Sequence, residues 1–134
     1  MLYLDTAALV KLVRREPESD ALADWLDERR GTPWVASALV EVELPRAVLR
    51  TEPALLPDVP GVLARVARYE IDDVVRAAAG AFPDPLLRSL DAIHLATATS
   101  VFGSTLQTFV TYDQRLLEAA QRHSLATASP GQVC

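Results

Sequence analysis

The sequence predicts an α/β protein in which helices cover both faces of a mostly parallel sheet of about four to five strands. Short apolar runs alternate along the chain with longer segments whose apolar residues recur at helical spacing. This alternation is typical of parallel sheets, because their strands need long crossover connections. The chain has 134 residues, of which 50% are hydrophobic and 23% charged. It is therefore long enough for a single domain with a real core and too apolar for intrinsic disorder.

The first half of the chain shows three helix signals in order. Residues 1–4 form an apolar run that predicts a strand, and a helix is expected from Thr6 because apolar residues recur at helical spacing up to residue 13. Pro17 is suited to the start of a second helix, which Gly31 ends. A short strand at 34–36 follows. Ser37 is a favourable cap for a third helix that runs towards Arg50.

The second half begins with a predicted loop at residues 51–60, which contain three prolines. A helix is expected at 61–68, a strand at 69–71 and another helix at 72–82. The prolines at 83 and 85 should break the chain before a long helix at 86–101. The remaining elements are a strand at 106–110, a helix at 113–123 and a last strand at 125–127.

Three aspartates each lie just past a short apolar stretch: Asp5, Asp91 and Asp113. A fourth carboxylate, Glu43, lies in an otherwise apolar helical run. Residues just beyond the carboxyl ends of parallel strands collect at one edge of the sheet, where ligands bind. Two such charges a few ångströms apart repel by about 1 kcal/mol in water and about 4 kcal/mol near a protein surface. Convergence therefore favours a site for hard divalent cations, which in turn suggests hydrolysis of a phosphodiester.

Each aspartate also has a purely structural interpretation. Asp5 and Asp113 each precede a predicted helix and would cap it, and Asp91 would lie in the first turn of a helix capped by Ser89. Taken singly, capping is the more common role of such residues. The two roles are compatible, because a capping carboxylate has a second oxygen that is available to a metal ion.

Glu43 is harder to explain structurally, because its neighbours are apolar. Its structural alternative is an ion pair with Arg46 three residues later. Glu41 is a competing carboxylate, and it lies two residues away on a different face of the helix. Spacing alone does not distinguish the two glutamates.

The net charge of −5 is unusual for a protein that binds nucleic acid, since such surfaces are usually basic. The four site acids account for most of that charge, and bound cations would offset them. No apolar run approaches the ~18 residues of a membrane span, and the N-terminus leads directly into a strand without a leader pattern. We therefore expect a cytoplasmic protein with no membrane partner.

Four segments in this order resemble the PIN domain, and more narrowly the VapC toxins of bacterial toxin–antitoxin pairs. They are residues 4–11 (LDTAALVK), 37–44 (SALVEVEL), 89–96 (SLDAIHLA) and 111–116 (TYDQRL). No single segment is specific, but their order and intervals together span the whole chain. The resemblance implies that residues 1–134 form a single three-layer α/β PIN domain.

The same resemblance implies a Mg²⁺- or Mn²⁺-dependent endoribonuclease that is inhibited by a VapB-like antitoxin. It assigns the four family acids to Asp5, Glu43, Asp91 and Asp113, and it favours Glu43 over Glu41. Asp5, Asp91 and Asp113 would be metal ligands, and Glu43 would orient or deprotonate water. Thr6 and Thr111 would support the ligands. We also expect a homodimer.

Two residues depart from the family pattern. Ala7 occupies a position where serine is common, and Pro45 follows Glu43 where a helix former is usual. Pro45 should kink the helix and could displace Glu43. The alternative function is therefore a PIN-like binding scaffold with weak or no catalysis. A haloacid-dehalogenase-type enzyme fits less well, because Ala7 stands where its second aspartate would be, and the acidic pair of a receiver domain is not evident.

Several other polar or aromatic residues are weaker candidates. Four basic residues lie close in sequence to the acids and could guide RNA phosphates: Lys11, Arg46, Arg88 and Arg115. Solvent exposure with ion pairing explains each of them equally well. His94 is expected to be packed or hydrogen-bonded rather than a ligand, and His123 to be a charge at a helix C-terminus. Trp25 and Trp34 are expected in the core or an interface.

Overall fold

The computed structural model describes residues 1–132. Within these residues, five parallel strands form one sheet in the order β3-β2-β1-β4-β5. The strands are β1 (Leu2–Leu4), β2 (Trp34–Ser37), β3 (Val66–Tyr69), β4 (Thr108–Val110) and β5 (Thr127–Ala128). Because β1 lies between β2 and β4, residues that follow these three strands come together at one edge of the sheet. The predicted parallel α/β architecture is confirmed.

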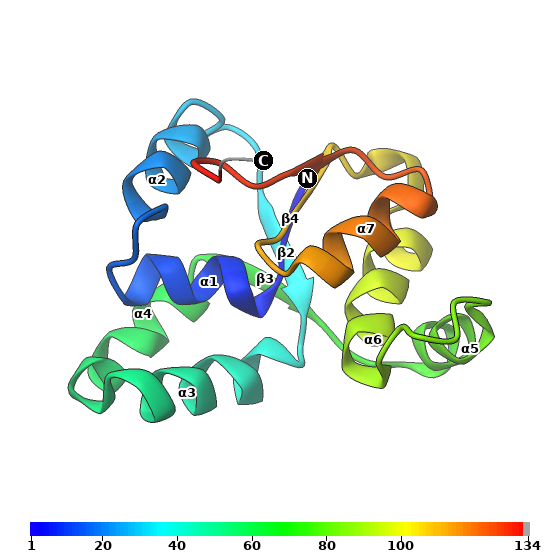
Figure 1. Ribbon diagram of the computed structural model, residues 1–134, viewed down its shortest axis with the longest axis horizontal. Helices are drawn as coiled ribbons and strands as arrows, with labels where there is room; N and C mark the ends of the chain where they lie inside the picture. Colours follow the sequence, from blue (N-terminus) through cyan, green and yellow to red (C-terminus); the bar gives the residue numbers. More distant parts are fainter. Residues whose placement is uncertain (133–134) are drawn as a thin grey trace.

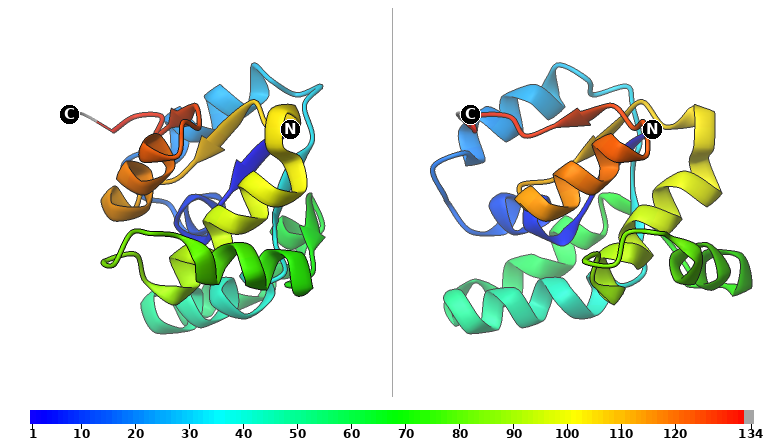
Figure 2. Two further views of the ribbon diagram at one scale, coloured as in Figure 1. Left: turned by 90° about the vertical axis from the view of Figure 1, so that its right-hand side faces the viewer. Right: turned by 45° about the vertical axis from the view of Figure 1, so that its right-hand side comes forward.

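Helices connect the strands and cover both faces of the sheet (Figures 1 and 2). The α-helices are α1 (Thr6–Val13), α2 (Ser19–Asp27), α3 (Val40–Thr51), α4 (Val59–Leu63), α5 (Asp73–Ala81), α6 (Ser89–Thr97) and α7 (Gln114–Arg122). A 3₁₀ segment at Pro53–Asp58 joins α3 to α4, and a π-helical turn at Ala98–Phe102 and a 3₁₀ turn at Gly103–Thr105 follow α6. Among the described residues, the helices are all too short or too polar to span a membrane.

Successive side chains of a strand point to opposite faces of the sheet and therefore pack into two separate cores. In β1, Leu2 and Leu4 pack with residues of α1, α2, α3 and α4, whereas Tyr3 packs on the other face with residues of α6 and α7. Helix α5 packs against α6 on the outside of that second layer. The resulting three layers hold the carboxyl edge of the sheet between α1 and α3 on one side and α6 and α7 on the other (Figure 1).

The segment between α3 and β3 differs from the sequence-based expectation. The predicted loop at 51–60 contains the end of α3, the 3₁₀ segment and the start of α4. Pro53 and Pro60 lie in the first turns of these segments, where the fixed φ of proline favours helix. The predicted helix at 61–68 therefore ends at Leu63. Strand β3 starts at Val66 rather than residue 69, and because it is an edge strand only Val66 is buried, which weakens its apolar signal.

Two predicted helix caps and several element ends are also corrected. Ser37 belongs to β2, and its Oγ accepts a hydrogen bond from the Leu39 amide, so it does not cap α3 in the standard way. Helix α6 begins at Ser89 without a side-chain cap, so Ser89 does not cap it either, although Asp91 lies in the first turn as expected. The predicted helix at 86–101 is α6 followed by the π-helical turn. Strand β5 lies at 127–128 rather than 125–127.

Candidate active site

The ends of β1 and β4 place the first and fourth acids next to each other. Asp5 follows β1 directly and caps α1, while Thr111 and Asp113 follow β4, which pairs with β1. Asp113 caps α7 through bonds from the amides of Arg115 and Leu116 at 2.9 and 3.2 Å. Asp5 and Asp113 therefore cap helices, as the sequence allowed. Their position at the sheet edge is also compatible with metal binding.

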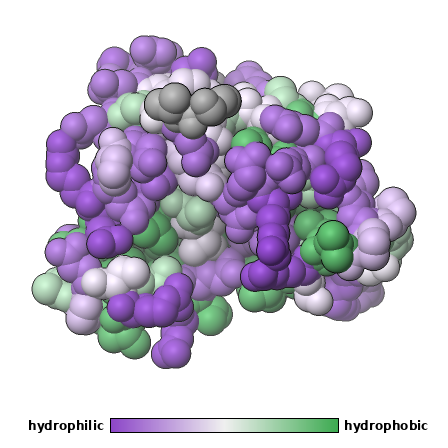
Figure 3. Space-filling view, viewed as in Figure 1, coloured by the Kyte–Doolittle hydropathy of each residue, from purple (hydrophilic) through white to green (hydrophobic). Residues whose placement is uncertain are grey.

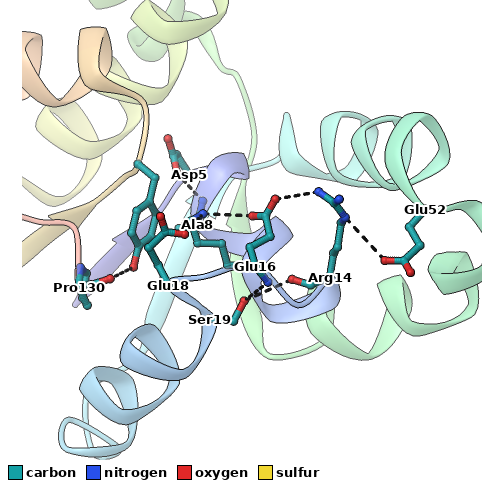
Figure 4. Close-up of polar contacts among 10 residues, drawn as sticks. Asp5, Ala8, Arg14, Glu16, Glu18, Ser19, Glu52 and Pro130 are labelled. Atoms are coloured by element: carbon teal, nitrogen blue, oxygen red, sulfur yellow. Dashed lines mark hydrogen bonds and ion pairs between the residues drawn. The ribbon is translucent and has the colours of Figure 1, made fainter. Parts of the chain in front are cut away.

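Asp5 is a buried carboxylate in a strongly polar setting. Its side chain is 3% exposed, and Oδ1 accepts a 2.9 Å hydrogen bond from the Ala8 amide (Figure 4). Oδ2 accepts from the Thr111 hydroxyl, which also accepts from the Asp113 amide at 3.1 Å. Burial raises the pKa of Asp5 to about 6, although His94, Thr111 and the Ala8 amide act in the opposite direction. The nearby Asp113 raises the pKa further.

Glu43 reaches the same edge from α3. Its Oε1 accepts a 2.6 Å hydrogen bond from the Thr6 hydroxyl and a 2.7 Å hydrogen bond from His94 Nε2. Burial would raise the pKa of Glu43, but the bonds from His94 and Thr6 outweigh it and the pKa is lowered. Helix α3 runs through Pro45 without interruption. Glu43 therefore keeps its two hydrogen bonds at the sheet edge with Pro45 in place, and an effect of Pro45 on activity stays a prediction.

Glu41 points to a different part of the molecule. Its carboxylate pairs with Arg68 of the edge strand β3 at 3.0 Å, and both side chains are well exposed to solvent. The two glutamates thus have distinct environments, although the sequence spacing did not separate them. Glu43 is the one whose carboxylate contacts the groups at the sheet edge.

His94 connects Glu43 to the buried core of the second layer. It is 3% exposed, and its Nδ1 lies 2.7 Å from the hydroxyl of the fully buried Tyr3. The Tyr3 hydroxyl accepts from the Ser37 amide at 3.1 Å. Since the Glu43 carboxylate can only accept, His94 Nε2 carries a proton and donates it to Glu43. The chain of bonds from Ser37 through Tyr3 and His94 fixes one oxygen of Glu43.

Tyr3 was not identified from the sequence as a functional residue. The only signal for it is a hydroxyl inside an otherwise apolar strand (LYL), which is also common in ordinary cores. His94 was expected to be packed or hydrogen-bonded, and the structure confirms both. Its partners Tyr3 and Glu43 are far away in sequence, so their contact with it depends on the tertiary fold.

Asp91 lies in the first turn of α6, half-buried beside the other acids. Burial raises its pKa, and so do the charges of Asp113 and Glu43, while His94 and Arg88 lower it. Together with the effect of Asp113 on Asp5, these influences connect the carboxylates in series, because Asp5 senses Asp113 while Asp91 senses both Asp113 and Glu43. The structure brings together all four acids that the sequence singled out.

The acids do not form a closed metal cage. Within residues 1–132, no three Asp, Glu, His or Cys side chains gather closely enough to hold an ion on their own. The donor set nevertheless fits a hard divalent cation, because every candidate ligand is a carboxylate oxygen and Mg²⁺ commonly uses only one or two carboxylates together with waters. Burial raises the pKa of Asp5 and Asp91, and the charge of Asp113 adds to the rise in both, so a bound cation would stabilise their ionised forms.

Of the four basic residues considered for phosphate binding, Lys11 is already engaged within the protein. Its ammonium lies 3.1 Å from Glu16 and 2.9 Å from Glu18, and 4.5 Å from the centre of the Tyr112 ring. Figure 4 shows the neighbouring contacts of Glu16 with Arg14 and Ser19. Lys11 therefore holds the segment between α1 and α2, and its ammonium is occupied by Glu16 and Glu18 rather than available to a phosphate.

The other three candidates for phosphate binding, Arg46, Arg88 and Arg115, are all exposed. Arg88 is close enough to Asp91 to lower the pKa of that carboxyl. His123 terminates α7 as expected, and its Nε2 lies 3.0 Å from Asp84. Trp25 and Trp34 pack against the first core and are covered by arginines at 3.8 and 4.1 Å, so they are not part of the site.

The fold and the site together define an α/β/α protein whose acidic centre at the carboxyl edge of the sheet suits hard divalent cations. The chain belongs to the PIN-domain family: the family model for the PIN domain matches residues 2–122. Ribonucleases of this family generally depend on divalent metal ions. The resemblance seen in the four sequence segments is thereby confirmed.

Similar proteins cover the whole chain. It is 60% identical to ribonuclease VapC35 of Mycobacterium tuberculosis over 134 residues, which is 99% of each chain, and 41% identical to ribonuclease VapC46 of the same organism over 96% of this chain and 97% of that one. Its fold matches a chain in the crystal structure of VapBC2 from Rickettsia felis bound to a promoter DNA fragment. That match has a TM-score of 0.71 at 17% identity and covers 96% of this chain and 98% of that one.

Proposed function

We propose that this chain is the toxin of a VapBC-type toxin–antitoxin pair, a cytoplasmic endoribonuclease that uses Mg²⁺ or Mn²⁺, with residues 1–134 as its single domain. The observation that carries the proposal is the convergence of Asp5, Glu43, Asp91 and Asp113 at one edge of the sheet. The chain's 60% identity to a ribonuclease over its full length supports RNA as the substrate.

The environments of the four acids suggest a different catalytic role for the aspartates and for Glu43. Asp5 and Asp91 would hold the principal cation, and Asp113 would help to hold a second, weaker one. A bound divalent cation supplies a more acidic water and stabilises the leaving oxygen. Glu43, fixed by Thr6 and His94, orients the attacking water and accepts its proton. Hydrolysis breaks the P–O3′ bond, so that the products carry a 5′-phosphate and a 3′-hydroxyl.

The alternative, a PIN-like scaffold without catalysis, predicts binding without turnover. Its main support was Pro45, and that support is weaker because Glu43 keeps its two hydrogen bonds. Pooled cellular RNA incubated with the protein and Mg²⁺ or Mn²⁺ tests the two functions. We expect the wild-type protein to cleave the RNA and a chelator to stop the cleavage. Asp91→Asn should lower the cleavage rate by at least about 100-fold. The control Asp24→Asn, on the exposed face of α2, should keep the wild-type rate. RNA left intact by the wild-type protein would favour the scaffold.

We further propose that the protein is a homodimer that binds a small VapB-like antitoxin across the acidic site. Large apolar side chains remain exposed beside the site acids, among them Val42 next to Glu43, and Leu86 and Leu90 just before Asp91. The surface in Figure 3 is mostly hydrophilic, with apolar areas that are small and separate. Exposed apolar side chains near the acids suit a partner that makes apolar contacts there and inserts a basic side chain, such as arginine, in place of the metal ions.

Light scattering is expected to give twice the mass of one chain at micromolar concentration. Adding a saturating amount of the cognate antitoxin should abolish RNA cleavage, because the basic side chain would occupy the metal positions. A monomeric mass would contradict the dimer, and full nuclease activity in the saturated complex would contradict binding at the acidic site.

A further inference from the structure

A second concave site lies directly beside the acids. It is a cavity of about 310 Å³ whose lining shares Asp91 with the candidate active site. Its six lining residues come from the segment before α6, from α6 and from α7: Leu86, Leu87, Asp91, Arg115, Glu118 and Arg122. Because Asp91 belongs to both sites, a group in the cavity would lie next to a phosphate held by the acids.

The cavity is held in shape by the contacts of Asp84. The Asp84 side chain is only 10% exposed, and its carboxylate pairs with Arg122 at 2.9 Å and with His123 at 3.0 Å. These contacts fasten the segment between α5 and α6 to the end of α7. The opposing walls are therefore tied together, and the position of the Arg122 guanidinium is fixed, as in a preformed ligand site.

One wall of the cavity is apolar. Leu87 packs into the second core, whereas Leu86 is 89% exposed at the cavity. An exposed leucine beside a polar cavity offers a flat apolar surface, and no other part of the described chain covers it. Such a surface suits the face of a planar ring.

The other wall has a donor and an acceptor on the same side of α7. Arg115 has no carboxylate partner within 4.0 Å among residues 1–132, so its guanidinium is available. Glu118 uses Oε1 to accept from Gln114 Nε2 at 3.1 Å, and its Oε2 has no such bond. Residues three apart on a helix are neighbours, so the guanidinium and the carboxylate present a donor and an acceptor to the same ligand.

The charges of the lining exclude a simple phosphate site. Asp91 and Glu118 balance Arg115 and Arg122, and Arg122 is already neutralised by Asp84. A phosphate would meet two carboxylates and only one available guanidinium. A neutral, planar, polar-edged group matches better, and single-stranded RNA supplies such groups as unstacked bases that proteins read at their edges.

Among the four bases, guanine matches this lining best. Its N1–H and N2–H groups are parallel donors that the two oxygens of one carboxylate can accept, and its O6 and N7 are acceptors for a guanidinium. Adenine has no carbonyl for Arg115, and uracil and cytosine lack the parallel pair of donors for Glu118. We propose that the cavity is a base-binding subsite that accepts guanine at a nucleotide adjoining the scissile phosphate, an inference that rests on the proposed ribonuclease function.

Cleavage of a random RNA pool, followed by sequencing of the new ends, tests the subsite. For the wild-type protein we expect guanine to be enriched at one fixed position within about two nucleotides of the cut. Glu118→Gln and Arg115→Ala should each reduce that enrichment by about tenfold, because each removes one half of the recognition. The control Glu28→Gln, on the exposed end of α2, should keep the wild-type pattern.

A binding experiment separates this proposal from the proposed function. Fluorescence anisotropy of labelled short oligoribonucleotides, in chelator, should show tighter binding of a guanine-containing oligomer than of its inosine- or adenine-substituted counterpart, and Glu118→Gln should abolish the difference. Inosine lacks only the N2 amino group, so it tests the second donor directly. If the wild type cuts no RNA but this preference is present, the ribonuclease function fails and the base site stands.

Three results would overturn the subsite. The first is cleavage without any base preference near the cut, and the second is a guanine preference that survives both substitutions. The third is that Glu118→Gln or Arg115→Ala keeps the guanine preference but is no longer inhibited by the antitoxin. The cavity would then bind the protein partner rather than RNA.

Discussion

Asp5→Asn is expected to abolish RNA cleavage and, at the same time, to make the metal-free protein more stable at neutral pH. The substitution keeps the shape of the side chain, and asparagine caps α1 about as well as aspartate through the Ala8 amide. It removes a charge that is almost fully buried and lies near Asp113. Catalysis needs that charge to hold a cation, whereas the fold is destabilised by it.

The sign of the pH dependence follows from the raised pKa. The pKa of Asp5 is about 6 in the folded protein against an ordinary value of 3.8 for an aspartate in the unfolded chain, so the folded protein binds more protons between these values. The contribution of Asp5 to stability is therefore fully present below about pH 4 and is lost as the pH rises through 6. The gap of about two pH units corresponds to about 3 kcal/mol, or a melting temperature higher by about 5 °C or more in the variant.

Thermal melts from pH 4 to 8, in chelator and in millimolar Mg²⁺ or Mn²⁺, measure both effects. Asp5→Asn should flatten the fall in stability across this range, and it should also shrink the rise that metal produces, because a ligand stabilises only through its preferential binding to the folded state. Asp24→Asn on α2 serves as the exposed control. Cleavage at more than a tenth of the wild-type rate, or a melting temperature that neither substitution nor metal changes, would contradict the clustered-carboxylate site.

The elements that the sequence predicts well are those with a clear local pattern of apolar residues. Strand β1 is a fully buried central strand and β4 is buried except at its first residue, Thr108, so both have a strong apolar signal. The edge strand β3 contains an exposed arginine, and its start was placed three residues too late. The proline-rich segment after Arg50 was taken as a loop because proline breaks helices in their interior, yet proline also starts them.

The same distinction applies to the site. The aspartates could be found because strand ends and parallel topology together fix where residues after β1 and β4 must lie. The bonds that orient Glu43 could not, because Thr6 and His94 reach it from two helices that are remote in sequence, and Tyr3 in turn holds His94. The cavity beside Asp91 was missed for the same reason. Its shape depends on Asp84 holding α7, and nothing in the local sequence around Asp84 indicates that contact.

Glu43→Gln and Glu41→Gln form a matched pair with opposite expected results. Glutamine at 43 keeps the length of the side chain and can still bond to Thr6 or His94, but it cannot accept a proton from water or hold negative charge beside Asp91. Removing a general base typically lowers the rate by about 100-fold to 10,000-fold, so we expect a loss of at least about 100-fold.

Glutamine at 41 removes only an ion pair with Arg68 near the surface, and pairs of this kind contribute about 0–1 kcal/mol to stability. Its cleavage rate should therefore stay within about twofold of the wild type. Both variants should melt close to the wild-type temperature, which separates loss of chemistry from loss of fold. Single-turnover cleavage of one RNA substrate by the two purified proteins decides the assignment. If Glu41→Gln were inactive and Glu43→Gln active, the second acid of the site would be Glu41, and the hydrogen bonds from Thr6 and His94 would have only a structural role.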